Sequence, residues 1–329
     1  MSAPTTQLKP QTATEAKPLA SASLLGPLLV LVFAVSQALR DVYFGFIFQR
    51  VDFFAVLLIA FGLSALGFGL WTLLREPEQI TVLRKDIRAV VAMNITTALA
   101  WSCFFFALSQ IEPAIVNTIH SGMAPLTVLA LAAFGIKLGG SGATNRLERL
   151  SYAVMAASLA ALWIVVLSGA SGAQGKTFAG QLAALAALLV SGSMITLSLL
   201  YSKRLHDIGA TSASITSVRY LVTIVLAAAM TWHDTRQGGG LARINGLVDF
   251  TTIAVAAVAL IVIPLFALQA GIARTPHLTG QVIRALGPVL VFAAQPLDSR
   301  LSWSLPTLIC ICVYSAAIIA ANVFHGWRR

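Results

Sequence analysis

Long apolar segments without charged residues limit how this chain can fold more than any other feature. Segments 53–74 and 251–271 each exceed the roughly 18 apolar residues that a helix needs to cross a hydrocarbon core of about 30 Å. In lipid every backbone N–H and C=O must bond within the protein, which leaves helices and closed barrels. Barrel strands alternate apolar and polar residues, and these segments do not. The sequence therefore predicts an all-α membrane protein.

The composition agrees with this fold class. Hydrophobic residues make up 58% of the chain and charged residues 10%, whereas soluble domains carry about 25% charged residues. The net charge of +10 comes from short loops between apolar segments, which is typical of topology signals. Cys103, Cys310 and Cys312 show no metal-ligand or disulfide spacing. We therefore expect a lipid bilayer as the surroundings, and no metal, cofactor or nucleic-acid partner.

The apolar segments predict ten transmembrane helices. With the N-terminus inside, 14 of the 22 lysines and arginines fall in inside segments, five in outside segments and three within spans. This bias places both termini in the cytoplasm and the protein in the cell (inner) membrane. Residues 1–22 are rich in Ser, Thr, Pro and Ala and are predicted to form a disordered cytoplasmic tail. The expected spans are 24–47, 53–74, 88–109, 114–135, 150–169, 179–202, 210–231, 250–272, 277–296 and 303–325.

An internal repeat groups these spans into two sets of five. Phe106–Val128 and Gln269–Val291 are similar at an offset of 163 residues, which aligns Pro125 with Pro288. The repeats are predicted to cover 23–170 and 171–329. An odd number of helices per repeat inverts the second copy in the membrane. Inverted repeats are typical of secondary transporters, whose sites lie near the midplane at the repeat interface.

These motifs also carry a family resemblance. Phe105–Leu126 forms a helix, a tight turn with Pro113, and a second helix that reaches Pro125; Arg219–Tyr220 forms an Arg–aromatic pair, with Ala60–Phe61 at the matching place of the first repeat. In these features the chain resembles the drug/metabolite transporter superfamily, EamA type. The resemblance implies a ten-helix carrier that exports metabolites or amino acids through a central cavity.

Ionisable side chains within spans are the candidates for binding, because each costs several kcal/mol in lipid. We predict that Arg284 binds an anionic group of the substrate, since a guanidinium binds a carboxylate or phosphate with two hydrogen bonds. His120 lies close to the equivalent position of the first repeat and would be a hydrogen-bonding or protonatable neighbour. The alternative is that Arg284 pairs with Asp41 or with backbone carbonyls for structural reasons.

We expect different roles for the remaining charged residues within or near the spans. Asp41 lies well inside a span and is the candidate for proton coupling. Arg40 precedes it directly, so on a helix the two are not expected to face each other. Arg40 and Arg219 are predicted to be structural charges. Glu112 and Asp298 sit near the membrane surfaces and are expected to be solvated.

Uncharged polar and aromatic residues complete the predicted binding site. They lie within spans of both repeats, where each could line a cavity or hydrogen-bond between helices. The predicted substrate-binding set comprises Arg284, His120, Asn117, Gln281, Gln37, Asn94, Trp101, Ser193 and Tyr314.

Together these features favour a secondary transporter, not an enzyme. It would export a small metabolite with an anionic group, such as an amino acid, by alternating access around a midplane cavity. An integral membrane enzyme acting on a lipid or lipid-linked substrate, a channel and a non-transporting membrane scaffold are the alternatives. Protons are the candidate coupling ion, and both a monomer and a homodimer are compatible with the sequence.

Overall fold

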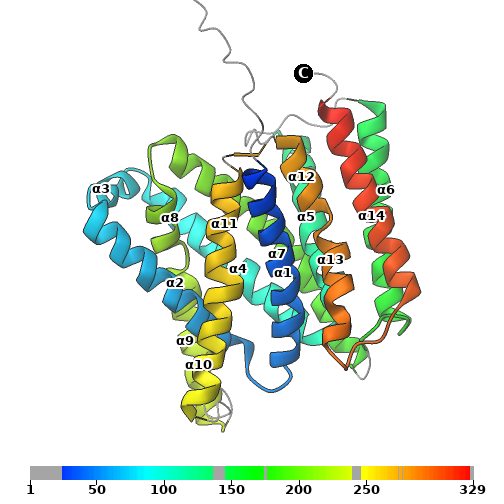
Figure 1. The fold of residues 1–329 in the computed structure, drawn as a ribbon, viewed down its shortest axis with the longest axis horizontal. Helices are drawn as coiled ribbons and strands as arrows, with labels where there is room; N and C mark the ends of the chain where they lie inside the picture. Colours follow the sequence, from blue (N-terminus) through cyan, green and yellow to red (C-terminus); the bar gives the residue numbers. More distant parts are fainter. Residues whose placement is uncertain are drawn as a thin grey trace, which may run out of the picture.

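The computed structural model describes residues 24–135, 145–173, 176–238, 246–272, 274–275 and 277–326. The predicted N-terminal tail, 1–22, and the side chain of Gln281 lie outside the described part. The described chain is helical, with one isolated β-bridge between Ala173 and Leu301. In chain order (Figure 1) the helices are α1 (Leu25–Ile47), α2 (Phe53–Arg75), α3 (Gln79–Arg84), α4 (Ile87–Gln110), α5 (Pro113–Ala133), α6 (Arg146–Leu167), α7 (Phe178–Asp207), α8 (Ser212–Arg219), α9 (Leu221–Arg236), α10 (Gly246–Ala257), a π-helical turn (Val258–Val262), α11 (Ile263–Ile272), α12 (His277–Ala285), α13 (Gly287–Ala294), a 3-10 turn (Gln295–Leu297) and α14 (Leu305–Gly326).

Within the described residues, eight helical segments are long and apolar enough to cross a membrane. They are α1, α2, α4, α5, α6, α7, α14 and the pair α8–α9. The expected spans at 250–272 and 277–296 are helical but divided. A π-helical turn separates α10 from α11, and Leu286 separates α12 from α13. The fold is therefore that of an all-α integral membrane protein.

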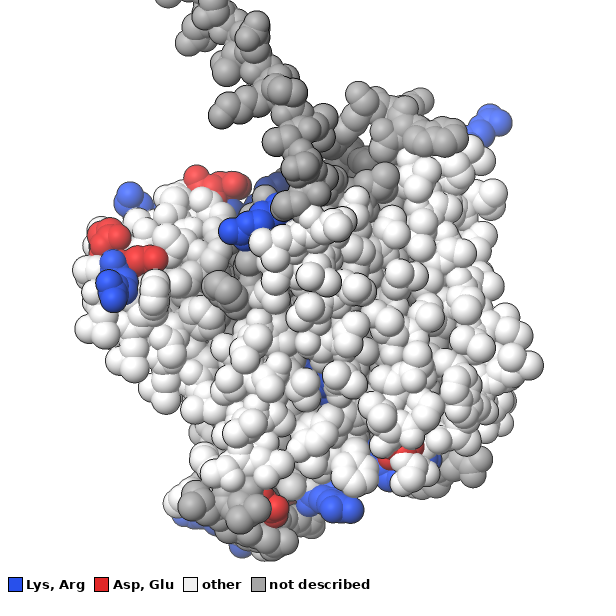
Figure 2. All heavy atoms as spheres, viewed as in Figure 1, with Lys and Arg blue, Asp and Glu red and all other residues white. Residues whose placement is uncertain are grey.

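The surface carries an apolar band. Large apolar side chains point outward along the helices, among them Leu66 (65% exposed), Ile164 (69%) and Val225 (69%). Figure 2 shows Lys, Arg, Asp and Glu gathered at the upper and lower ends of the molecule, with a nearly charge-free face between them. Water would disfavour such a band, whereas lipid tails match it.

The two ends of the molecule differ in which segments they hold. The described chain begins at α1 and finishes at α14 on the same side (Figure 1). We call this side the near face. The opposite side, the far face, holds the turns that join α1 to α2, α4 to α5, α6 to α7 and α13 to α14.

Capping residues set where several helices begin. Asp52 accepts hydrogen bonds from the backbone N–H groups of Phe54 and Ala55 at the start of α2. Thr177 accepts one from Gly180 at the start of α7. These contacts satisfy backbone donors that have no partner within the helix, so the far-face turns end where the apolar spans start.

Small residues bring α7 close to α5. A Cβ atom added at Gly192 of α7 would lie 2.4 Å from Cβ of Met123 and 2.5 Å from the backbone oxygen of His120. Only glycine fits this contact, and close approach of backbones through small residues is typical of helix pairs in membranes. The contact fixes the part of α5 that carries His120.

Candidate functional site

Two helices are interrupted deep in the molecule, and each carries an arginine in its last turn. Arg219 is the last residue of α8 and Tyr220 separates it from α9. Arg284 lies in the last turn of α12, before the break at Leu286. Pro288 accounts for this second break, because proline lacks the N–H that would bond the backbone oxygen four residues before it, and its ring crowds that oxygen. Pro125, its aligned partner, lies within the uninterrupted helix α5.

A cavity of about 390 Å³ opens between these breaks. Its volume falls in the range of about 300–1,000 Å³ that is typical of small-molecule sites. Helices of both predicted repeats contribute to its wall. The residues of the sequence-based predictions that line it are Gln37, Arg40, Trp101, Asn117, His120, Arg219, Arg284 and Tyr314.

Arg284 is open to this cavity. Its side chain is solvent-accessible although helices surround it, because it projects into the hollow that they enclose. Among the described residues it has no hydrogen-bond or ion-pair partner. The alternative that Arg284 pairs with Asp41 is wrong, since Asp41 bonds elsewhere. A guanidinium with free donors is therefore available to a ligand.

Asp41 is held in a buried ion pair with its own neighbour. Arg40 Nε and Nη2 lie 2.8 and 2.6 Å from Asp41 Oδ1, and Asn117 Nδ2 donates to Oδ2 at 2.7 Å. The expectation that Arg40 and Asp41 do not face each other is wrong, because the long arginine side chain folds back to reach the carboxylate. The guanidinium also lies over the rings of Trp101 and Phe104, at 5.3 and 5.6 Å. Arg40 is thus neutralised and stacked.

The hydrogen bonds around His120 define which ring nitrogen carries a proton. Ser191 Oγ donates its single hydrogen to the backbone oxygen of Ala100 at 2.7 Å. It must then accept from His120 Nδ1, which lies 2.9 Å away. In the neutral imidazole Nε2 is left as an acceptor. Phe104 packs edge-on against the ring, with 4.8 Å between centroids.

Arg219 lines the cavity but is tethered. Its Nε and Nη2 donate to Thr97 Oγ1 at 3.3 Å and to Ser198 Oγ at 3.1 Å. These hydroxyl partners leave its charge uncompensated. Its neighbour Tyr220 stacks on Phe61, with 4.3 Å between ring centroids.

Two described residues of the predicted binding set do not line the cavity. Asn94 donates to the backbone oxygen of Val90 and accepts from the N–H of Val222, so it bridges α4 to the start of α9. Ser193 accepts a hydrogen bond from Thr127 and does not line the cavity. Gln281 lies outside the described side chains.

The sequence-based prediction missed several lining residues. Tyr220, Phe104, Thr196 and Asn322 also contribute to the wall. Asn322 is a polar residue within the last span, so the rule that selected Gln37 could have found it. The aromatic residues gave no such signal, because apolar packing explains most aromatic residues in a span.

The far face is sealed by contacts between the α6–α7 and α13–α14 loops. The backbone N–H of Ser302 donates to Gly172 O at 3.0 Å, and Ala173 pairs with Leu301 in the β-bridge. Ser304 Oγ donates to Ala170 O at 2.7 Å. We call these contacts the far-face seal. They join the loop at the boundary of the two predicted repeats to the last loop of the second repeat.

Glu112 lies inside this seal. It is fully buried, and its Oε2 accepts from the N–H of Gly172 at 2.7 Å and from Thr307 Oγ1 at 3.2 Å. Burial raises the pKa of the Glu112 carboxyl. Asp298 is 2% exposed. The expectation that Glu112 and Asp298 are solvated is therefore wrong, because the loops of the far face fold over both.

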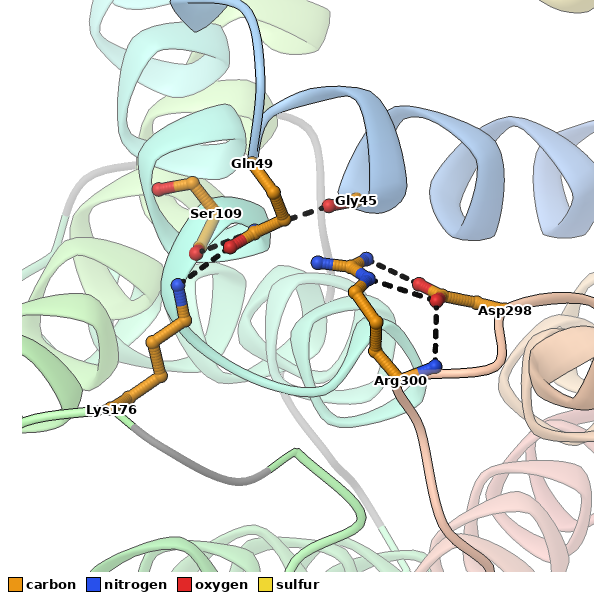
Figure 3. Close-up of polar contacts among 6 residues, drawn as sticks. All are labelled: Gly45, Gln49, Ser109, Lys176, Asp298 and Arg300. Atoms are coloured by element: carbon orange, nitrogen blue, oxygen red, sulfur yellow. Dashed lines mark hydrogen bonds and ion pairs between the residues drawn. The ribbon is translucent and has the colours of Figure 1, made fainter.

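Polar side chains near the seal in sequence bond to neighbouring groups (Figure 3). Lys176 Nζ donates to Gln49 Oε1 at 2.8 Å, and Gln49 in turn donates to the backbone oxygens of Ser109 and Gly45. Arg300 forms an ion pair with Asp298 through two nitrogens. Burial and then the charge of Arg300 lower the pKa of Lys176.

The cavity extends the other way. Its wall continues from Asn117 toward Leu199 and Asn322, which lie in the near-face halves of α7 and α14. The wall of the cavity therefore extends toward the near face, away from the seal.

Comparisons with known proteins bear on the fold. No protein-family model matches the chain, and no curated protein matches it in sequence. Nine chains of known structure are similar. One, described only as the crystal structure of a protein, superposes over 92% of this chain and 97% of its own with a TM-score of 0.58 and 19% sequence identity. At that identity the likeness concerns the fold alone.

Proposed function

We propose that the protein is a secondary transporter that exports a small metabolite with an anionic group across the cell (inner) membrane. The observation that carries the proposal is Arg284, an arginine without a partner among the described residues that opens into a cavity between broken helices. An uncompensated charge at this depth costs several kcal/mol. An anionic substrate would offset that cost while it is bound.

The break beside Arg284 adds a second attraction for an anion. Gly287, at the start of α13, lines the cavity. The N-terminus of a helix carries free backbone N–H groups and a partial positive charge. Broken helices whose ends meet a midplane cavity are typical of secondary transporters. Arg284 and the start of α13 would therefore hold the same anionic group.

Helix contacts support ten spans in two inverted repeats. In the proposed order α4 is the third span, α7 the sixth, and α10–α11 the eighth. α4 contacts α7, and the equivalent helix of the second repeat, α11, contacts the equivalent first helix, α1. In the same way α5 contacts α7, and its equivalent α13 contacts α1. The equivalent pairs α2 with α9, α5 with α13, and α6 with α14 touch each other. Phe61 and Tyr220, aligned by the repeat, stack together.

The direction of export follows from charge and access. The excess of lysine and arginine supports a cytoplasmic near face, and the cavity extends toward that face. This conformation would load substrate from the cytoplasm, and release would require the far-face seal to open.

Asn117 connects substrate binding to Asp41, because Asn117 lines the cavity and donates a hydrogen bond to the Asp41 carboxylate. A proton on Asp41 is the proposed link to a pH gradient.

The test begins with a screen of metabolites by ligand-induced thermal shift, followed by counterflow in proteoliposomes with the best ligand. Saturable counterflow separates a carrier from a membrane enzyme or a scaffold. Arg284→Ala should abolish transport and weaken binding by roughly 30-fold or more, since losing one partner of a buried charge pair costs about 2–5 kcal/mol. Arg284→Lys should weaken binding less, because it keeps the charge without the paired donors.

Arg236→Ala is the matched control, because Arg236 lies on the surface at the end of α9 over Trp232. It should transport as the wild type does. Asp41→Asn should lose gradient-driven transport while it keeps exchange. Wild-type transport by a monodisperse Arg284→Ala protein would contradict the proposal.

A further inference from the structure

The charges around the central cavity do not balance. Three guanidinium groups, those of Arg40, Arg219 and Arg284, line it. Asp41 neutralises Arg40. No carboxylate is among the residues that line this cavity in the described part of the chain. Glu148, which lines a smaller adjoining hollow, is engaged in an interaction of its own. Two positive charges, on Arg219 and Arg284, are left over.

The polar groups near these arginines do not supply the missing negative charge. Arg219 has hydroxyl partners, Thr97 and Ser198, which are neutral. The Nδ1–H tautomer of His120 is fixed by Ser191 and Ala100, so its imidazole offers one neutral acceptor. Two guanidinium groups that face one hollow in a medium of low dielectric repel each other until anions enter.

We infer that the substrate carries two negative charges and no cationic group, as a small dicarboxylate or a phosphate ester does. The inference rests on the proposed function and narrows its substrate class. Each of the two arginines would receive one anionic oxygen pair, or both would hold one doubly charged group. The ammonium of an amino acid would instead meet two positive charges, with no free carboxylate in the wall to receive it.

Four probes of similar size separate charge from shape. Succinate has two carboxylates, and monomethyl succinate has one. L-aspartate has two carboxylates and an ammonium group, and glycerol 3-phosphate is a phosphate dianion. Their dissociation constants would be measured by calorimetry on the purified full-length protein. We expect succinate or glycerol 3-phosphate to bind at least about 30-fold more tightly than both monomethyl succinate and L-aspartate. Whichever of these two dianions binds more tightly identifies the preferred anionic group as carboxylate or phosphate.

Charge-neutral variants check that the arginines cause this preference. Arg219→Gln keeps a donor for Thr97 and Ser198 but removes one charge, so it should bind monomethyl succinate about as tightly as succinate. Arg219→Lys keeps the charge and should keep the preference. If Arg219→Gln elutes as aggregate, Arg284→Gln provides the same measurement.

The outcomes separate this inference from the function. Equal binding of monomethyl succinate and succinate, or tighter binding of L-aspartate, overturns the inference that the substrate is a dianion. The proposal that the protein transports an anionic metabolite is not affected by that result. Absence of saturable binding for all four probes also overturns it. The proposed function itself fails when counterflow with the best ligand of the screen is absent or does not depend on Arg284.

Discussion

The two faces of the molecule are held together by different kinds of contact. On the near face, Arg204 of α7 pairs with Asp86 before α4, with the arginine side chain 64% exposed, and the side chain of Gln79 accepts from the backbone N–H of Thr211. On the far face, backbone groups of two loops bond to each other around the buried Glu112. Exposed ion pairs contribute little to stability, about 0–1 kcal/mol, whereas buried backbone hydrogen bonds are costly to leave unmade. Under the proposed function, the far face, where two loops close below the cavity, is the gate, and the near face, toward which the cavity extends, is the entrance.

A disulfide across the far-face seal should have the largest effect. Paired residues on antiparallel strands have Cα atoms about 4.5–5.5 Å apart, which suits a disulfide. In a background without Cys103, Cys310 and Cys312, Ala173→Cys with Leu301→Cys should cross-link on oxidation. Because release requires the gate to open, counterflow should fall to background and return on reduction.

Each single cysteine variant is the control for this cross-link and should transport with or without oxidant. In intact cells an impermeant thiol reagent should label the single cysteine at position 173, because the far face is proposed to lie outside. Full transport by completely cross-linked protein would show that this face is not the gate.

A methyl group inside the seal should weaken it. A Cβ atom at Gly172 would lie 2.3 Å from Ser302 O, so Gly172→Ala must push the two loops apart. Overpacking of this kind costs about 1–3 kcal/mol. We expect a lower melting temperature in detergent and faster labelling of Ala173→Cys. At Gly62 an added Cβ meets nothing within 4 Å, so Gly62→Ala should change neither the melting temperature nor the labelling rate. An equal fall in melting temperature in both variants would contradict the expected overpacking at Gly172.

The smallest expected effect is a pH dependence of the seal. Burial raises the pKa of Glu112 above its ordinary value of 4.5, and in an open gate water would return it toward that value. The ionised carboxyl therefore disfavours closure, and closure becomes more favourable as the pH falls from the raised pKa toward 4.5. Below that pH both forms are protonated and the effect is constant.

The measurement compares labelling of Ala173→Cys with and without Glu112→Gln, which cancels the titration of the thiol itself. Glutamine keeps an oxygen acceptor for Gly172 and cannot ionise. Labelling relative to this variant should slow by a few-fold in acid. A ratio that is constant with pH would mean that Glu112 does not control the gate.

The sequence predicted eight of the spans that the structure shows and much of the cavity wall for one physical reason. Polar groups are rare in lipid, so residues such as Arg284 and His120 stand out. The sequence-based predictions were wrong for residues whose contacts come from distant parts of the chain, and for a long side chain that reaches its neighbour. Glu112 is buried by Gly172 and Thr307, 60 and 195 residues away. Arg40 reaches Asp41 because its side chain is flexible, which a rule based on helix positions does not include.

The broken segment α12–α13 has a consequence for how the protein is made. Its apolar part, Val282–Leu297, is shorter than a membrane-spanning helix requires. Arg284 makes insertion still less favourable, because an arginine costs up to about 2.5–3.5 kcal/mol, its value at the centre of an inserting helix, on the scale set by the translocon. Helices α1, α5 and α14 contact this segment. Its residence in the bilayer thus depends on neighbours synthesised before and after it, which makes membrane insertion here a step of tertiary folding.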